Sequence, residues 1–466
     1  MVAIYALAPP VQRQSVPLFA SIQLVALSIL ISAGLLIWRS AVATFYIEFH
    51  PWSDFASQIG AFVIPVLGLI VAYFSWRRAN LTTKKDKKFR KFIQTCIKEN
   101  RFDEPLRILA KNEESIANVL ERETLDLIFE RPFIESTVNG RNWIHLKLLS
   151  NKELIKKLTD IDAATNNLMR VLLNAETSPM HSAIVADYGG SEYLRPTKEE
   201  GKLIEKTLQN PEWYMSVRAD YPLIISAYET VASGELDEQY NQKGDLYTAR
   251  QGESTRLRCP IYLALKTHVL MLKKAIEIEG EEDYYVSDLW DLFKTICEHS
   301  KYNPDVWEDR DVNWEYPTPF AYLMKEIMLD LRNLCREREI LKQRIQPQGR
   351  IGTDLIRTWA TCVSNLGCSR DKVSDKFKFE LVRYYLIFTL ERKEEYENFE
   401  GESKQNSEKW CDLLVEELNR YSRGNRHLRE VLFQSMNGLD LGRHYTDYED
   451  WLRKELDLSK RQIPSD

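Results

Sequence analysis

The chain has 466 residues, of which 28% are charged and 44% hydrophobic, a composition that excludes intrinsic disorder and is ordinary for a folded protein. The net charge of −6 conceals an asymmetry: residues 1–91 carry ten Lys and Arg against three Asp and Glu, and residues 92–466 carry 53 against 66. The first part therefore has a net charge of +7 and the second −13, which makes the larger part a poor general partner for a nucleic-acid backbone.

Two long apolar segments lie near the N-terminus. Residues 14–38 and 55–76 contain no charged side chain, and each segment is longer than the roughly 20 residues that a helix needs to cross a bilayer. We therefore predict transmembrane helices at about 15–38 and 55–76, joined by an external loop.

An alternative for the first segment is a cleaved signal peptide, since Ala41-Val42-Ala43 resembles a small-x-small cleavage site. We favour a transmembrane helix, because the apolar stretch is longer than that of a signal peptide and Arg39 intervenes. Neither segment contains an ionisable side chain, so a single hairpin offers no ion pathway. The hairpin is then either a simple anchor or a unit that assembles with others to perturb the membrane.

A basic strip follows the second apolar segment directly. Residues 74–91, with the sequence FSWRRANLTTKKDKKFRK, hold eight basic side chains and one acid. A free-standing run of this kind suggests a nuclear address or a nucleic-acid site, but beside a span it indicates the cytoplasmic edge of a membrane. We predict an inner (plasma) membrane protein with both termini in the cytoplasm. The predicted contacts with the bilayer's anionic lipid headgroups are Arg77, Arg78, Lys84, Lys85, Lys87, Lys88, Arg90 and Lys91.

The rest of the chain has the 3.6-residue period of amphipathic helices, and no alternating run indicates a sheet. Apolar residues share one helix face at 89–97, at 289–297 after Ser287, and at 320–334, where Thr318 is the predicted N-cap and Pro319 the first helical residue. Further helices are predicted at 153–174, 261–278, 353–366, 376–394, 407–421 and 427–436. The predicted fold is all-α, with a transmembrane hairpin and a large helical cytoplasmic body.

Two polar stretches interrupt the helical pattern. Residues 237–259 predict an exposed loop, which divides the chain into a membrane anchor (1–91) and two helical cytoplasmic subdomains (92–236 and 237–466). The second stretch, residues 302–319, mixes acids with aromatic residues, and we favour a loop fixed to the body by its tryptophans over a partner-binding site. Its aromatic residues are Trp307, Trp314 and Tyr316.

The cysteines give no support for a disulfide framework or a metal site. Seven of them are scattered along the chain, mostly beside apolar residues, so we expect reduced thiols in the core of a cytosolic body. The groups Cys297-Glu298-His299 and Cys362 with Cys368 lack the paired short spacing of zinc ligands. We therefore expect no metal and no other cofactor.

The sequence contains no phosphate-binding loop, GxSxG elbow, HExxH motif or kinase signature. Arg420 and His427, with six residues between them, resemble the Arg and His pair of all-helical RNases of the HEPN superfamily, which is understood to act on RNA by acid–base chemistry. Arg141 and His145 have only three residues between them and depart from that pattern. Gly424 interrupts the first pair, so we favour exposed helix ends over a catalytic site.

Taken together, the hairpin, the basic strip and the helical body resemble the two-transmembrane effectors of bacterial anti-phage defence, of the retron-associated and abortive-infection types. The resemblance implies that a cytoplasmic protein or ribonucleoprotein partner restrains the body. Release would let hairpins assemble as a homo-oligomer and perturb the inner membrane. A membrane-tethered scaffold or sensor subunit and a membrane-tethered HEPN-like RNase remain as alternatives.

Overall fold

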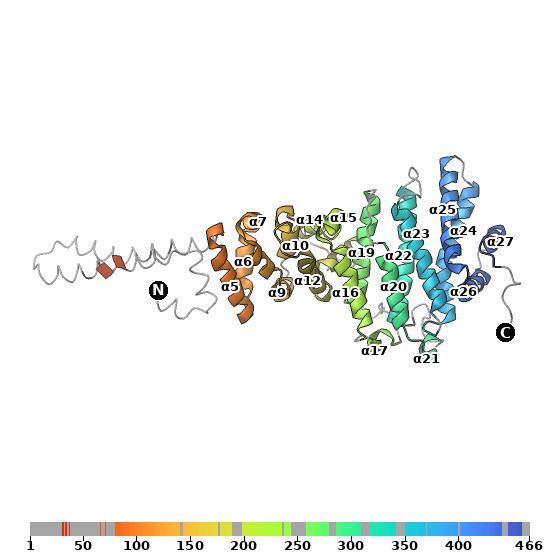
Figure 1. Ribbon diagram of the computed structural model, residues 1–466, viewed down its shortest axis with the longest axis horizontal. Coiled ribbons are helices and arrows are strands. Elements are labelled where there is room, and N and C mark those ends of the chain that lie inside the picture. The colour runs from red at the N-terminus through yellow and green to blue at the C-terminus, as the bar shows by residue number, and fades with distance from the viewer. Residues whose placement is uncertain are drawn as a thin grey trace, which may run out of the picture. The chain divides into compact units, whose positions relative to one another are not determined.

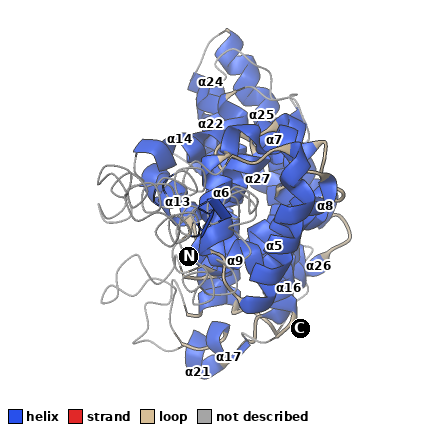
Figure 2. Ribbon diagram, turned by 90° about the vertical axis from the view of Figure 1, so that its left-hand side faces the viewer, coloured by secondary structure: helices blue, strands red, loops and turns tan. Residues whose placement is uncertain are grey.

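The computed structural model describes most of the chain after residue 79 (Figure 1). It describes residues 80–458 except 140–142, 176–177, 189–197, 235–236, 244–257, 279–285, 309–316, 342–349, 370, 399–400 and 440–445, together with residues 30, 31, 33, 34, 37, 66 and 70. Every regular element in these residues is a helix, which confirms the all-α prediction for the body (Figure 2).

The transmembrane hairpin is not established by this structure. The predicted spans lie almost entirely outside the described residues, and none of the described helices combines the length and the apolar character needed to cross a bilayer. The hairpin therefore stays a prediction.

The chain divides into two compact units, unit 1 (residues 1–171) and unit 2 (residues 172–466). The division falls within α12 (Ile161–Asn174). The predicted boundary between residues 236 and 237 would lie inside unit 2, and it stays a prediction.

Unit 1 is a cluster of short helices around the apolar face predicted at 89–97. Its elements before α12 are η1 (Thr83–Lys85), α5 (Asp86–Glu99), α6 (Asp103–Lys111), η2 (Glu113–Ser115), α7 (Ile116–Val119), α8 (Arg122–Ile128), α9 (Arg131–Asn139), α10 (Ile144–Leu149) and α11 (Lys152–Ile155). Phe89, Phe92, Ile93 and Cys96 are buried on one side of α5, as predicted, and α5 contacts α8. The single helix predicted at 153–174 is wrong, because residues 156–160 separate α11 from α12.

Unit 2 consists of longer helices. These are α13 (Pro179–Tyr188), α14 (Lys198–Lys206), α15 (Pro211–Val217), α16 (Asp220–Ala232), α17 (Asp237–Tyr240), α19 (Pro260–Glu277), α20 (Asp288–His299), α21 (Pro304–Trp307), α22 (Pro319–Leu341), α23 (Arg350–Cys368), α24 (Asp375–Asn398), α25 (Glu402–Ser422), α26 (Arg426–Asn437) and α27 (Thr446–Glu455). Helices α19, α22, α23, α24 and α25 lie side by side (Figure 1). The central helix α19 contacts α13, α15, α16 and α22, so it lies in the core.

The start of α22 shows how local sequence positions a core helix. The Ala321 N–H donates to Thr318 Oγ1 at 3.1 Å, and Pro319 is the first helical residue, as predicted. All six apolar residues predicted on this face are at most 2% exposed. At α20, Ser287 occupies the N-cap position but makes no capping hydrogen bond within the described part of the chain.

The stretch predicted as an exposed loop at 237–259 is partly structured. Its first residues form α17, and Tyr240 is buried, with its ring stacked on Phe320 at 5.2 Å between centroids. The Tyr240 hydroxyl lies 2.8 Å from Cys259 Sγ, at the other end of the stretch. The prediction failed there because a buried aromatic contact with α22 outweighs the polar composition.

The cysteine prediction is largely correct. All seven cysteines are free thiols and six of them are buried, while Cys368 is exposed at the end of α23. Burial raises the pKa of the buried Cys96 thiol to about 12, so that thiol stays protonated at neutral pH.

Gly367 allows α23 and α26 to approach closely. A Cβ placed at residue 367 would lie 2.8 Å from Leu428 Cα and 2.9 Å from its Cβ. Because Leu428 is fully buried, it has little freedom to move away. The distance between these helices therefore depends on the absence of a side chain at this position.

We expect Gly367→Ala to lower the Tm of the full chain. Alanine favours a helix by about 1 kcal/mol over glycine, but overpacking a core contact costs about 1–3 kcal/mol, so the clash should outweigh the propensity. Thermal unfolding followed by circular dichroism measures the effect. Ser364→Ala on the same helix is the control and should change Tm little; a stabilised Gly367→Ala would show that the two helices separate freely.

Candidate functional site

The described part of the predicted basic strip presents lysines on one side of a helix. Lys84, Lys87, Lys88 and Lys91 are exposed, and their spacing of three and four residues places them on a common face across η1 and the start of α5. None of the four has an ion pair with another described residue. We call these four residues the lysine face.

The other basic residues of the strip have different surroundings. Arg90 lies 3.3 Å from Glu123 and 3.7 Å from Glu121, and Lys85 Nζ donates to the Asn80 carbonyl at 2.9 Å. These two side chains therefore contact unit 1 itself. Arg77 and Arg78 lie outside the described residues.

Of the three aromatic residues predicted to bind a partner, Trp307 lies within the described residues. Its indole is 4% exposed, packs edge-on against Phe377 of α24, and donates a hydrogen bond from Nε1 to the Lys301 carbonyl at 3.1 Å. Trp307 thus fixes α21 to the body, which was the favoured interpretation of this stretch. Trp314 and Tyr316 lie outside the described residues.

The weak catalytic candidates lie at adjacent helix ends. Arg420 is in the last turn of α25 and His427 in the first turn of α26, with Gly424 in a left-handed conformation between them. Arg420 is exposed, and its Nη1 lies 3.8 Å from Glu417 Oε2. No described contact joins the Arg420 and His427 side chains to each other.

His145, the second histidine considered for catalysis, is a core residue of unit 1. Its ring packs edge-on against Phe129 and Phe133, and Nε2 lies 2.8 Å from the Ile128 carbonyl, which can only accept. Nδ1 lies 3.0 Å from Thr137 Oγ1, and the single proton of that hydroxyl also has the Ile134 carbonyl as an acceptor, at 2.6 Å. Burial lowers the pKa of His145 to about 4, so the ring is neutral at pH 7.

A feature that the sequence did not reveal is a cleft of about 860 Å³ in unit 2, lined by α24, α25 and α27. We call it the acidic cleft. Its charged lining residues are the acids Glu408, Asp412, Glu416, Glu417 and Glu455 and the bases Lys393, Arg420 and Arg423. The spacing of Glu408, Asp412 and Glu416 at four-residue intervals is the only part of this arrangement that the sequence displays.

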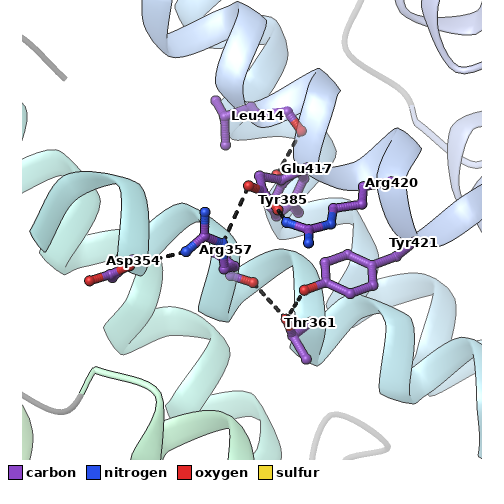
Figure 3. A network of polar contacts seen from close by, with 8 residues as sticks. All are labelled: Asp354, Arg357, Thr361, Tyr385, Leu414, Glu417, Arg420 and Tyr421. Atoms are coloured by element: carbon purple, nitrogen blue, oxygen red, sulfur yellow. Dashed lines mark hydrogen bonds and ion pairs between the residues drawn. The ribbon is translucent and has the colours of Figure 1, made fainter. Parts of the chain in front are cut away.

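A polar network meets the acidic cleft at Glu417 and Arg420 (Figure 3). Glu417 lies between Arg357 of α23, with Nε 3.4 Å from Oε1, and Arg420, and Arg357 in turn lies 3.4 Å from Asp354. The Tyr385 hydroxyl donates to the Leu414 carbonyl at 2.8 Å, which connects α24 to the same part of α25. The network therefore joins three helices at the wall that contains Glu417.

An aromatic pair lines the cleft near α27. The Lys393 ammonium lies 4.7 Å from the centroid of the Tyr396 ring and 5.0 Å from that of Trp451, and it pairs with Glu397 at 3.2 Å. Such distances are typical of attraction between a cation and an aromatic ring. The two rings thus already surround a positive charge.

Comparison with models of protein families, with curated proteins and with solved structures finds no match to this chain. Within the described residues, no group of three His, Cys, Asp or Glu side chains is arranged to hold a metal ion. The lysine face and the acidic cleft are therefore the two candidate functional surfaces among the described residues.

We expect His145 to make the stability of unit 1 depend on pH. Its folded pKa of about 4 lies below its usual value of 6.5, so the unfolded chain binds the proton more tightly. The stabilisation is complete above pH 6.5 and is lost as the pH falls toward 4, by about 3 kcal/mol in total. Hydrogen exchange of peptides from α8 to α10, measured between pH 4 and 7 and corrected for intrinsic rates, follows this loss.

His145→Gln cannot take up the proton, so it should remove this pH dependence in those peptides. His299→Gln, at the end of α20 in unit 2, is the control and should leave it in place. An unchanged pH dependence in His145→Gln would contradict the assignment of a neutral, buried imidazole.

Proposed function

We propose that this chain is a membrane-anchored effector of bacterial anti-phage defence. In this proposal, two apolar spans insert in the inner membrane, and the helical body lies at its cytoplasmic surface under the control of a protein or ribonucleoprotein partner. When the partner releases the body, hairpins from several copies assemble and perturb the membrane.

The observation that carries the proposal is the lysine face of η1 and α5. It begins eight residues after Trp76, the last residue of the second apolar segment, and its four ammonium groups lack described partners. The other side of α5 is buried in unit 1, whereas the lysine face is exposed and available to an external surface. An anionic membrane attracts such residues by roughly 1 kcal/mol for each lysine close to the headgroups.

Exposed apolar side chains in the two segments support the same proposal. Eight large hydrophobic side chains of the described residues are exposed, and five of them belong to the predicted spans. These five residues, Leu30, Ile31, Ile37, Val66 and Ile70, are all helical. Helical residues with exposed apolar side chains are stabilised by a lipid or protein environment.

The composition of the spans limits how they could act. Neither segment contains an ionisable residue, so one hairpin provides no polar path through the bilayer. Damage to the membrane would therefore require several copies, and the partner would control assembly by favouring one of two states of the body.

We expect induction of the full chain in a bacterium to cause propidium uptake and growth arrest, and deletion of residues 14–76 to abolish both. The deletion leaves residues 80–458, and hence the described body, intact. Growth arrest by both forms without dye entry would contradict the proposal and favour chemistry in the body, tested next with His427→Ala. No arrest by the full chain at matched expression would favour a scaffold or sensor.

We expect reversal of the lysine face to detach the body from an anionic surface. In nanodiscs that contain phosphatidylglycerol, the full chain should show slower hydrogen exchange in α5 than in phosphatidylcholine discs, because the lysines contact the headgroups. The variant Lys84→Glu, Lys87→Glu, Lys88→Glu and Lys91→Glu should lose this difference.

The matched control for that experiment reverses four other exposed lysines, Lys152, Lys202, Lys206 and Lys372. It changes the net charge by the same amount but leaves the lysine face intact, so it should keep the difference in hydrogen exchange between the two lipids. Equal behaviour of the two variants would show that net charge, and not the lysine face, governs the interaction.

A further inference from the structure

The single acid of the basic strip, Asp86, is fully buried. It is the first residue of α5 and lies on the side of that helix that packs into unit 1, together with Phe89 and Ile93. An exposed carboxylate at this position would offset part of the positive charge of the neighbouring lysines. Because Asp86 is buried, no acid of the strip itself lies among the exposed lysines.

Asp86 attaches the start of α5 to the start of α8. Its Oδ1 atom accepts a hydrogen bond from the Glu121 N–H at 3.0 Å, and Glu121 is the N-cap residue of α8. In a capping box, the side chain of the third helical residue accepts from this N–H. Here that residue is Thr124, whose Oγ1 is buried without a hydrogen-bond partner in the described part of the chain. Asp86 therefore fills this role from a different helix.

A second contact attaches the chain to unit 1 just before η1. Leu81 is 4% exposed, and its N–H donates to Asn112 Oδ1 at 2.9 Å. Asn112 is itself buried, and its Nδ2 donates to the Ile108 carbonyl of α6 at 2.7 Å, which fixes the orientation of the amide. We call the two contacts, Leu81 with Asn112 and Asp86 with Glu121, the α5 clamp.

The chain between the second apolar segment and the α5 clamp is short. Residues 77–79 separate Trp76, the last residue of that segment, from Asn80. A chain spans at most about 3.6 Å per residue, so Asn80 lies within about 14 Å of Trp76 whatever the conformation between them. If the segment crosses a membrane as proposed, this length keeps α5 near the headgroups. It does not decide which side of α5 faces them, whereas the clamp does.

We infer that Asp86 and Asn112 are positioning residues for membrane binding, which hold the lysine face in one orientation on unit 1 so that its four lysines meet an anionic surface together. A helix that is already held in its bound orientation loses less conformational entropy on binding than a frayed one. The inference rests on the proposed function and deepens it, since it concerns how the same surface is presented.

Asp86→Ala tests the inference because charge and position predict opposite results. The variant removes a negative charge beside the lysine face, so attraction alone would strengthen contact with an anionic membrane. Loss of the clamp would weaken it. Hydrogen exchange of α5 peptides in the full chain is compared between nanodiscs of phosphatidylglycerol and phosphatidylcholine. We expect the slowing by phosphatidylglycerol to fall by about threefold or more in Asp86→Ala, although all four lysines remain.

Asp86→Asn is the matched control. It loses the same charge but keeps Oδ1 as an acceptor for the Glu121 N–H, so it should retain the difference in hydrogen exchange between the two lipids. Glu114→Ala removes an exposed acid of η2 outside the clamp and should retain that difference as well.

Asn112→Ala provides a second test without a change in charge. It removes the acceptor of the Leu81 N–H, so it should also reduce the difference in hydrogen exchange between the two lipids. This variant decides the question if Asp86→Ala does not fold. Unchanged hydrogen exchange of α9 and α10 in detergent shows that unit 1 of a variant is folded.

The outcomes separate this inference from the proposed function. A difference between the lipids that Asp86→Ala and Asn112→Ala retain, or that Asp86→Ala increases, would overturn the inference alone. Loss of the difference in Asp86→Asn would show that the charge of this residue matters and not its hydrogen bond, which would also overturn the inference. No difference between the lipids in the unmodified chain would overturn the proposed membrane contact, and the inference with it.

Discussion

Unit 2 depends on a lysine ammonium buried between two carboxylates. Lys266 of α19 is 3% exposed, and its Nζ lies 2.5 Å from Glu326 Oε2 and 2.6 Å from Asp330 Oδ2, one turn apart on α22. Burial raises the pKa of Asp330 above its usual value and the Glu326 carboxylate adds to this effect, while Lys266 opposes both. A buried charge that loses its partner is strongly destabilising. A shift of α22 by one turn would leave Lys266 with only one of its two carboxylates, and we therefore attribute the register of the two helices to these ion pairs.

A series of helix contacts connects the Lys266 ion pairs to the acidic cleft. Helix α22 contacts α23 and α24, and Arg332 and Arg336 of α22 both bind Glu391 of α24, at 2.9 and 2.7 Å. Helices α23 and α24 in turn support α25, where Glu417 meets Arg357. The carboxylates of the cleft are thus held by elements whose positions follow from the buried core. A cleft built on rigid helices needs little rearrangement when it binds a partner.

The sequence predicted those features that depend on local patterns. The apolar faces of α5, α20 and α22 follow from a 3.6-residue period, and Thr318 caps α22 because its hydroxyl reaches the N–H of Ala321. Ser287 has the same residue class and position at α20 but does not cap, because its backbone is helical (φ −58°, ψ −27°) and not in the extended conformation typical of an N-cap.

The features that sequence missed depend on contacts between distant residues. The break between α11 and α12 and the burial of Tyr240 result from tertiary packing, which overrides local propensity. Lysine usually occupies exposed positions, and only the carboxylate partners of Lys266 on α22 make its burial possible. Likewise, Glu455 and Trp451 join the acidic cleft because α27 packs against α24, a contact that no spacing in the sequence displays.

The two candidate surfaces have opposite charge, and this difference links them physically. Residues 92–466 have a net charge of −13, so an anionic membrane of the kind proposed would repel the body as a whole while it attracted the lysine face. Screening limits both effects to about 10 Å at 0.1 M salt, so only groups close to the headgroups contribute.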